Sequence, residues 1–568
     1  MPQLLVVRYQ RHPLRWVVVC VSLLAVAPAV EDLTARTTLF FDDDPLAREP
    51  ETQDASRVEA WDLDLFVDLA INLFGQPGAP RTGVRAANVN TIDEVPDSGW
   101  FTNRVVARPV SIDEAVRAAS NGSGPAPGPW SVIAAKEIGV APGFTIHDTR
   151  GETWFVSFDA RGYPEAATAA ILVASKIFWT LGYWQADHVL THIRPDQVSI
   201  GDTATVRPMS GTRRKMRVSD LDAIWARAHR AADGSYRAVA ARRLPGRPLG
   251  GFRYHGTRPD DPNDVIPHEH RRELRALKVF GAWVNLVDIK AGNTLDVLVT
   301  GDGRSVVRHY LQDVGSTFGT GATAPREYFE GWEHLYEGDL LLKRLVSVGF
   351  LIRPWQTLPY PDTAAVGRFE SASFDPTTWK ARVPAAALRH AQPDDLFWAA
   401  RRVMAFSDDV IRSLVQTADY SDPRDAAYLA ETLIQRRNKI GAAYLNAVTP
   451  LVNFSLSADG RLSFDNAAVT ANAAPPPRGG YRLSWAYVDN QAATIETIGT
   501  TTSLTGEGAP PPEALRVHDG WLVRVRVTPV DPSMEAWKPI DAYFRRVPDG
   551  WRLVGLDRGG VIGRTLRS

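Results

Sequence analysis

The stretch "NLVDIKAGN", residues 285–293, places three different polar side chains within a few positions: Asp288, Lys290 and Asn293. Further along, "YLQDVGSTFG" places Asp313 directly before Val-Gly. Phosphoryl transfer needs one carboxylate that accepts a hydroxyl proton, and an amide and a second carboxylate that hold a divalent metal ion. The two stretches therefore indicate a candidate phosphotransferase site. The alternative is that they are two unrelated polar loops.

The residue types suggest a role for each position. Asp288 suits the catalytic base, and Lys290 suits a cation near the transferred phosphoryl group. Asn293 and Asp313 suit metal ligands, and such hard oxygen donors favour magnesium or manganese over zinc. Asp313 ends the predicted strand "VVRHYLQD", and Gly315 allows the backbone to turn immediately after it.

The order of predicted elements around this site indicates a mixed α+β fold. Short apolar runs between glycines predict strands, whereas an alanine-rich run with apolar residues every three or four positions predicts a helix. Strands are expected in residues 130–139, 142–149, 152–160, 197–209, 235–244, 519–529 and 548–557. Helices are expected in residues 163–184, 268–287, 338–350, 394–418 and 423–448. The helix 268–287 leads directly into Asp288.

A chain of 568 residues is too long for one ordinary hydrophobic core, so we expect several domains. The expected parts are a signal peptide or membrane anchor (1–30), an N-terminal extension (31–129), a β-rich lobe (130–247), a mainly helical lobe (248–448) and a small β-rich C-terminal domain (449–568).

The overall charge is balanced, with 64 Lys and Arg against 65 Asp and Glu. This balance argues against a protein that binds a nucleic-acid polymer, although a local basic site remains compatible with it. Cys20 is the only cysteine in the sequence, which excludes an intramolecular disulfide and a cysteine-based zinc site.

The N-terminus resembles an export signal. Arg8, Arg11 and Arg15 precede the apolar run "WVVVCVSLLAVAPAV", residues 16–30, which ends in small residues suited to cleavage. An uncleaved run would anchor the chain to a membrane. We therefore expect a periplasmic, secreted or membrane-anchored protein.

"DIKAGN" together with "DVG" resembles the catalytic and metal-binding loops of the protein-kinase-like superfamily, including its atypical members. Over roughly residues 40–450 the chain also resembles a group of uncharacterised exported bacterial proteins, for example in "TIDEVPDSGWFTNR". The resemblance implies a two-lobed kinase-like fold, in which residues 130–247 bind ATP and residues 248–448 carry Asp288 and the magnesium or manganese ligands.

Two positions depart from the family pattern. Val314 stands where many relatives carry Phe, at a position that packs and does not coordinate. Ser157 stands on the strand where a kinase-like fold places its phosphate-binding lysine, and Glu165, at the start of the next helix, would be the partner of that lysine. Lys136, expected on a neighbouring strand, is the best substitute for the missing cation.

We therefore expect an atypical kinase that binds ATP and a divalent metal and phosphorylates an unknown protein or small-molecule acceptor. The alternative is a catalytically impaired pseudokinase that acts as a binding or scaffolding module in the cell envelope. A third alternative is an envelope structural protein with an unrelated fold.

Overall fold

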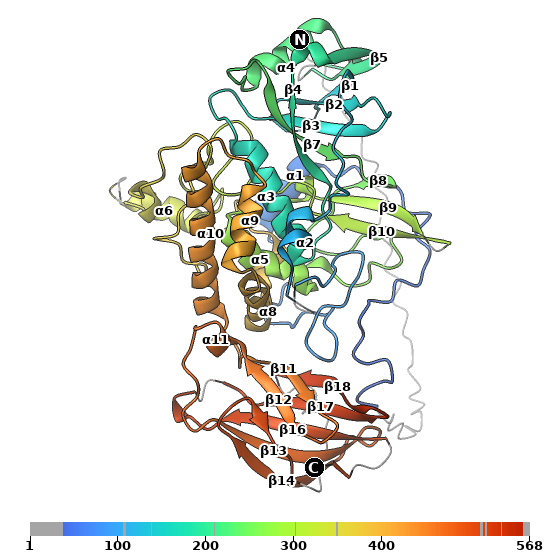
Figure 1. Cartoon of the computed structure of the whole chain (residues 1–568), viewed down its shortest axis with the longest axis vertical. Helices are drawn as coiled ribbons and strands as arrows, with labels where there is room; N and C mark the ends of the chain where they lie inside the picture. The colour runs from blue at the N-terminus through green and yellow to red at the C-terminus, as the bar shows by residue number, and fades with distance from the viewer. Residues whose placement is uncertain are drawn as a thin grey trace, which may run out of the picture.

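The computed structural model describes residues 38–559, except residues 106–108, 138, 209–210, 302, 348–349, 351, 512–514, 517–519 and 535–536. Over this part of the chain the fold is mixed α+β, as predicted, with several separate sheets. The molecule is elongated, and its first sheet, its central helices and its C-terminal sheets follow one another along the long axis (Figure 1). The predicted signal or anchor lies outside the described residues, and none of the described helices is long and apolar enough to cross a bilayer.

The first sheet has seven strands in the order β4-β7-β3-β2-β1-β5-β6. Their bounds are Trp130–Ala135 (β1), Gly143–His147 (β2), Thr153–Phe158 (β3), His188–Ile193 (β4), Val198–Val206 (β5), Arg214–Lys215 (β6) and Tyr236–Arg242 (β7). The first three strands form an antiparallel meander. Because side chains alternate between the faces of a strand, Phe144, Trp154 and Phe158 point into one core. Helix α4 (Val218–Arg227) covers this core with Trp225.

Helix α3 (Ala166–Leu181) connects β3 to β4 and lies between the sheet and the central helices (Figure 1). Its alanines are small enough for close approach from several sides, and Ala169, Ala170 and Ala174 are fully buried. The helix begins after Glu165, whose φ of +65° places that residue in the left-handed region.

The central part is mostly helical. It contains α2 (Ile112–Arg117), α5 (Arg272–Val284), α6 (Gly338–Val346), α7 (Ala386–Arg389), α8 (Pro393–Met404), α9 (Asp408–Gln416) and α10 (Pro423–Tyr444). Phe280, Trp283 and Trp398 lie in the largest core, with Val314 buried in the same cluster. The single helix expected over 394–418 is in fact two, because the Ser407 side chain caps a new helix by accepting a hydrogen bond from the Val410 N–H at 3.2 Å.

A small sheet of order β10-β9-β8 lies beside these helices. Its strands are β8 (Arg247–Gly250), β9 (Leu295–Gly301) and β10 (Arg304–Tyr310). Short helical turns complete this half of the chain: α1 (Leu65–Ala70), η1 (Ile71–Gly75), η2 (Pro195–Gln197), η3 (His268–His270), η4 (Ala291–Asn293) and η5 (Pro354–Gln356).

The C-terminal part contains two sheets, with orders β11-β12-β15 and β14-β13-β16-β17-β18. The strands are β11 (Leu451–Leu456), β12 (Leu462–Asn466), β13 (Tyr481–Asp489), β14 (Ile495–Ser503), β15 (Glu507–Gly508), β16 (Trp521–Pro529), β17 (Ile540–Val547) and β18 (Gly550–Asp557). The short helices α11 (Ala467–Thr470) and η7 (Pro532–Met534) interrupt them.

Two contacts tie the beginning of the described chain to its end. Phe40 packs against Tyr543 with ring centroids 5.2 Å apart, at Gly555, where a Cβ atom would lie 2.3 Å from the Phe40 ring. Asp93 forms ion pairs with Arg272 of α5 at 2.8 Å and with Arg558, just after β18, at 3.0 Å. These contacts fix the C-terminal sheets to the N-terminal extension and to the helix that leads into the candidate site.

Candidate functional site

Helix α5 delivers the loop that carries Asp288. The helix ends at Asn285, which adopts the left-handed conformation (φ 55°, ψ 44°) and so turns the chain out of the helix. The Trp379 indole N–H donates a hydrogen bond to the Asn285 side-chain oxygen at 2.8 Å. Beyond the turn, the Phe318 N–H donates to the Val284 carbonyl oxygen at 2.8 Å. The loop is therefore held against the segment that follows Asp313.

Hydrogen bonds join the three residues that the spacing singled out. The Asn293 side-chain amide donates to the Asp288 carbonyl oxygen at 2.7 Å, and the Asp313 N–H donates to the Asn293 carbonyl oxygen at 3.0 Å. The hairpin of β9 and β10 produces this meeting, because its register pairs Leu295 with Tyr310 and so returns the chain to Asn293. Asp288, Asn293 and Asp313 thus belong to one cluster.

Asp288 is a buried carboxylate with one oxygen left free. Lys290 donates to its Oδ2 at 2.9 Å, and Arg326 lies 3.6 Å from the same oxygen. Oδ1 is buried and has no hydrogen-bond partner among the described residues. Burial alone raises the pKa of Asp288, but Lys290 and Arg326 outweigh burial and hold that pKa below its ordinary value. The group is therefore ionised at neutral pH, and its unpartnered oxygen is closed off from solvent in this conformation.

Lys136 reaches the position of Ser157 from two strands away. Its amino group donates to the Ser157 hydroxyl oxygen at 3.2 Å. Lys136 follows the end of β1, and β2 separates it from β3, so the expectation of a directly neighbouring strand is wrong. The intervening residue is Gly143, which pairs with Ser157, and a Cβ atom there would lie 3.4 Å from the Lys136 Cδ. A glycine in the middle strand leaves room for the lysine side chain to cross.

Lys136 is also an electrostatic neighbour of Asp313. Loss of hydration lowers the pKa of Lys136, although its side chain keeps contact with solvent, and the Asp313 carboxylate opposes that shift. Gly315 allows the Asp313 segment to lie close to α3, since a Cβ atom there would lie 2.8 Å from Ile171. The site thus brings together a cation of the first sheet and the carboxylate after β10.

Glu165 lies elsewhere. Both of its carboxylate oxygens accept a hydrogen bond from the Ser421 N–H, at 3.2 and 3.0 Å, in the turn before α10. Among the described residues no hydrogen bond or ion pair joins Glu165 to Lys136, and the sequence of α3 contains no Asp or Glu. The structure therefore brings Asp288, Lys290, Asn293, Asp313, Lys136 and Ser157 into one region and leaves Glu165 at the start of α3.

Sequence reasoning missed two further residues of this region. His188, at the start of β4, is affected electrostatically by Asp187 and Asp313, and burial lowers its pKa to about 4. Arg326 lies between Asp288 and Glu330, 3.6 Å from each. No local motif marks either residue, because each enters the site through tertiary packing.

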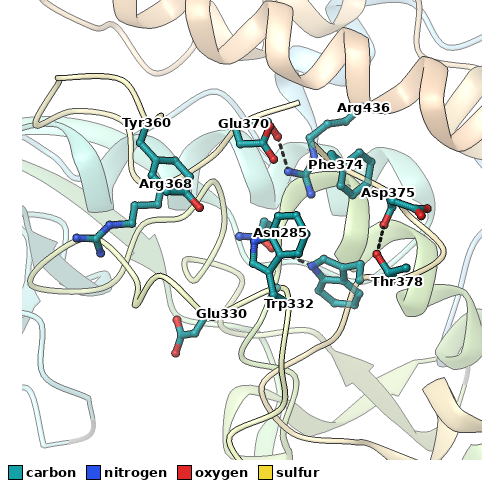
Figure 2. A pocket seen from close by; sticks show the side chains of 12 residues that line it. Asn285, Glu330, Trp332, Tyr360, Arg368, Glu370, Phe374, Asp375, Thr378 and Arg436 are labelled. Carbon is teal, nitrogen blue, oxygen red and sulfur yellow. Dashed lines mark hydrogen bonds between the residues drawn. The ribbon is translucent and has the colours of Figure 1, made fainter. Parts of the chain in front are cut away.

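A small cavity lies beside Asn285, the residue that ends α5 before the loop of Asp288 (Figure 2). It has a volume of about 30 Å³, room for a few water molecules, and Asn285, Glu330, Trp332, Tyr360 and Arg436 are among the residues that line it. Glu330 is one of these lining residues. Burial raises its pKa, and the nearby Asp288 carboxylate adds to this shift.

Asn293 and Asp313 are the residues of this region whose side-chain oxygens could take part in binding a magnesium or manganese ion. Asp313 is exposed, and only its Oδ1 accepts a described hydrogen bond, from the Gly315 N–H at 3.0 Å. Asn293 uses its amide nitrogen, which leaves its side-chain oxygen for a metal. Magnesium is commonly held by one or two carboxylates together with water and substrate phosphates. Over the described part of the chain, no group of three or more His, Cys, Asp or Glu residues is arranged to hold a metal ion.

In comparisons with known proteins, no family model, no curated protein and no solved structure matches the chain.

Proposed function

We propose that the chain is an atypical kinase-like phosphotransferase that binds ATP with magnesium or manganese. In this proposal the sheet of β1 to β7 is the nucleotide-binding lobe, and the helical part around α5 is the catalytic lobe. The observation that carries the proposal is the position of Lys136, whose amino group supplies a cation beside Ser157 and near Asp313. In the proposed correspondence, the phosphate-binding lysine of a kinase belongs on the strand that here carries Ser157, close to the metal-binding aspartate.

The described residues supply the chemistry of transfer to a hydroxyl. The Asp288 carboxylate accepts the hydroxyl proton while the acceptor oxygen bonds to the γ-phosphorus and the bond from that phosphorus to the β–γ bridging oxygen breaks. Lys290 and Lys136 supply positive charge that stabilises the transferred group. A bound divalent metal would neutralise phosphate charge, with Asn293 and Asp313 as its ligands. The acceptor is the hydroxyl of a protein or small molecule.

A pseudokinase is the second candidate, and two observations favour it. Helix α3 carries no carboxylate to pair with Lys136. Lys290 and Arg326 already neutralise Asp288 from one side. In this alternative the nucleotide site is a binding module of the cell envelope, and the C-terminal sheets recognise a partner. The predicted N-terminal signal supports an exported location for either candidate.

Titration calorimetry with ATP and magnesium, followed by an assay of phosphate release and transfer, separates the candidates. An active kinase binds ATP and turns it over, and Asp288→Asn leaves binding intact while it reduces turnover by about 100-fold or more. A pseudokinase binds ATP with no turnover that depends on Asp288. Failure to bind ATP with either metal would exclude the kinase and leave the scaffolding module as the better account.

A further inference from the structure

Helix α6 is oriented with its apolar side toward solvent. Leu341, Leu342, Leu345 and Val346 are all exposed, and none of the residues of this helix is buried. The exposed fraction reaches 75% at Leu345. In a water-soluble helix the apolar side normally faces the core, so this orientation calls for a covering surface. Figure 1 shows α6 at the margin of the molecule.

The polar side of α6 attaches the helix to the protein. Arg344 forms an ion pair with the mostly buried Glu333 at 3.2 Å. The same carboxylate pairs with Arg353 at 3.0 Å and accepts a hydrogen bond from the Trp355 indole at 2.7 Å. These contacts fix which side of α6 faces outward.

The apolar surface continues toward the candidate site. Tyr336, just before α6, contacts Phe74 of η1 with ring centroids 5.0 Å apart, and both rings are exposed. Phe66 of the adjacent α1 is 85% exposed. Leu65 packs against the loop that holds the predicted metal ligand Asn293, since a Cβ atom at Gly292 would lie 3.1 Å from it. The exposed apolar residues of α1, η1 and α6 therefore border the loop of Asp288.

We propose that this surface docks on a lipid bilayer that contains anionic lipids, with Leu341, Leu342, Leu345 and Val346 inserted at the level of the headgroups. Helices that lie in the membrane interface combine a solvent-facing apolar side with flanking Lys or Arg residues. Lys343 lies beside the apolar side of α6 with its side chain 65% exposed and its amino group 3.8 Å from Asp339, and anionic lipid attracts such an exposed cation. The predicted export signal independently indicates a location at or beyond a membrane. The docking does not rest on the phosphotransferase proposal, but if both hold, the acceptor hydroxyl is close to the membrane surface.

The test uses the full chain with Cys20→Ser, so that a polarity-sensitive fluorophore can be attached at one introduced cysteine. Leu345→Cys reports on α6, and Leu504→Cys, at an equally exposed leucine of the C-terminal part, is the matched control. Vesicles of phosphatidylcholine and phosphatidylglycerol should shift the emission at position 345 to the blue and leave position 504 unchanged. In the position-345 protein, Leu341→Glu should weaken the vesicle affinity that this shift reports by at least about tenfold.

Other outcomes overturn the proposal. An emission at position 345 that does not respond to vesicles would show that no bilayer covers α6, even if the N-terminus anchors the chain. An emission at 345 that is already blue-shifted without vesicles and depends on protein concentration would indicate that a second copy covers the helix. Equal shifts at 345 and 504 would mean non-specific adsorption. Because the assay contains no nucleotide, a failure of ATP binding leaves its result unaffected.

Discussion

The amino group of Lys136 lies 3.2 Å from the hydroxyl oxygen of Ser157, although a complete strand separates the two residues in the sheet. The contact relocates a cation to the position where the kinase-like pattern expects a lysine. If a cation at this place binds phosphate, a lysine at position 136 and a lysine at position 157 should serve equally well.

We therefore expect Lys136→Met to weaken ATP binding by about 10- to 100-fold, the loss typical of one charge-assisted hydrogen bond. Adding Ser157→Lys to that variant should restore most of the affinity, because it returns a cation to the same place. Titration calorimetry measures both effects. Lys215→Met, at an exposed lysine of β6, is the control and should bind ATP like the wild type. Unchanged affinity in Lys136→Met would contradict the role of this lysine.

The Lys136 side chain also needs Gly143, because it crosses β2 at this glycine to reach Ser157. In Gly143→Ala the new Cβ would lie 2.3 Å from the Val156 carbonyl oxygen and 3.4 Å from the Lys136 side chain. We expect a loss of about 1 to 3 kcal/mol in the free energy of unfolding, from overpacking, together with weaker ATP binding. Urea denaturation measures the first effect. Gly301→Ala, where a Cβ meets no atom within 4 Å, should leave stability nearly unchanged, and equal losses in both variants would refute the packing argument.

His188 gives the molecule a specific acid sensitivity. Burial lowers the pKa of His188 from 6.5 to about 4 in the folded protein, against the opposing effect of Asp187 and Asp313. Between these two values the unfolded chain binds a proton that the folded chain does not, so the free energy of unfolding decreases as the pH falls from about 6.5 to about 4. Because the residue is partly accessible to water, we expect His188 to account for about 1 to 2 kcal/mol of that decrease.

His188→Phe should remove this contribution, so that its unfolding free energy depends less on pH than that of the wild type over the same range. Thermal or urea unfolding at several pH values measures the dependence. His192→Phe changes an exposed histidine of the same strand and is the control. If the two variants show the same pH dependence as the wild type, His188 is not the responsible group.

Local patterns predicted most of the elements that build the site. The glycine-punctuated strands β1 to β3 and the alanine-rich α3 lie where they were expected. Strand β4, "HVLTHI", was missed because its residues do not alternate clearly between apolar and polar, and it forms through pairing with β7. Helix α4 was also missed, since it is a short insertion between two strands.

The spacing of Asp288, Asn293 and Asp313 was visible in the sequence, because the first two lie between α5 and β9 and the third lies just after β10. The crossing of Lys136 was not, because it depends on the register that places Gly143 opposite Ser157. The contact of Glu165 with Ser421 and the approach of Arg326 to Asp288 join segments that are separate in the sequence. Only the tertiary fold brings these segments together. Such contacts have no local signature.

The most direct measurement is the melting temperature of the purified protein with and without ATP and magnesium or manganese, beside Asp313→Ala. The account predicts a rise in melting temperature that needs both ATP and the metal, as expected for ligands that bind only the folded state. Asp313→Ala should abolish this rise, whereas Asp339→Ala, at an exposed aspartate of α6, should retain it. No rise in the wild type, or an equal rise in Asp313→Ala, would contradict a nucleotide site built on Lys136, Asn293 and Asp313.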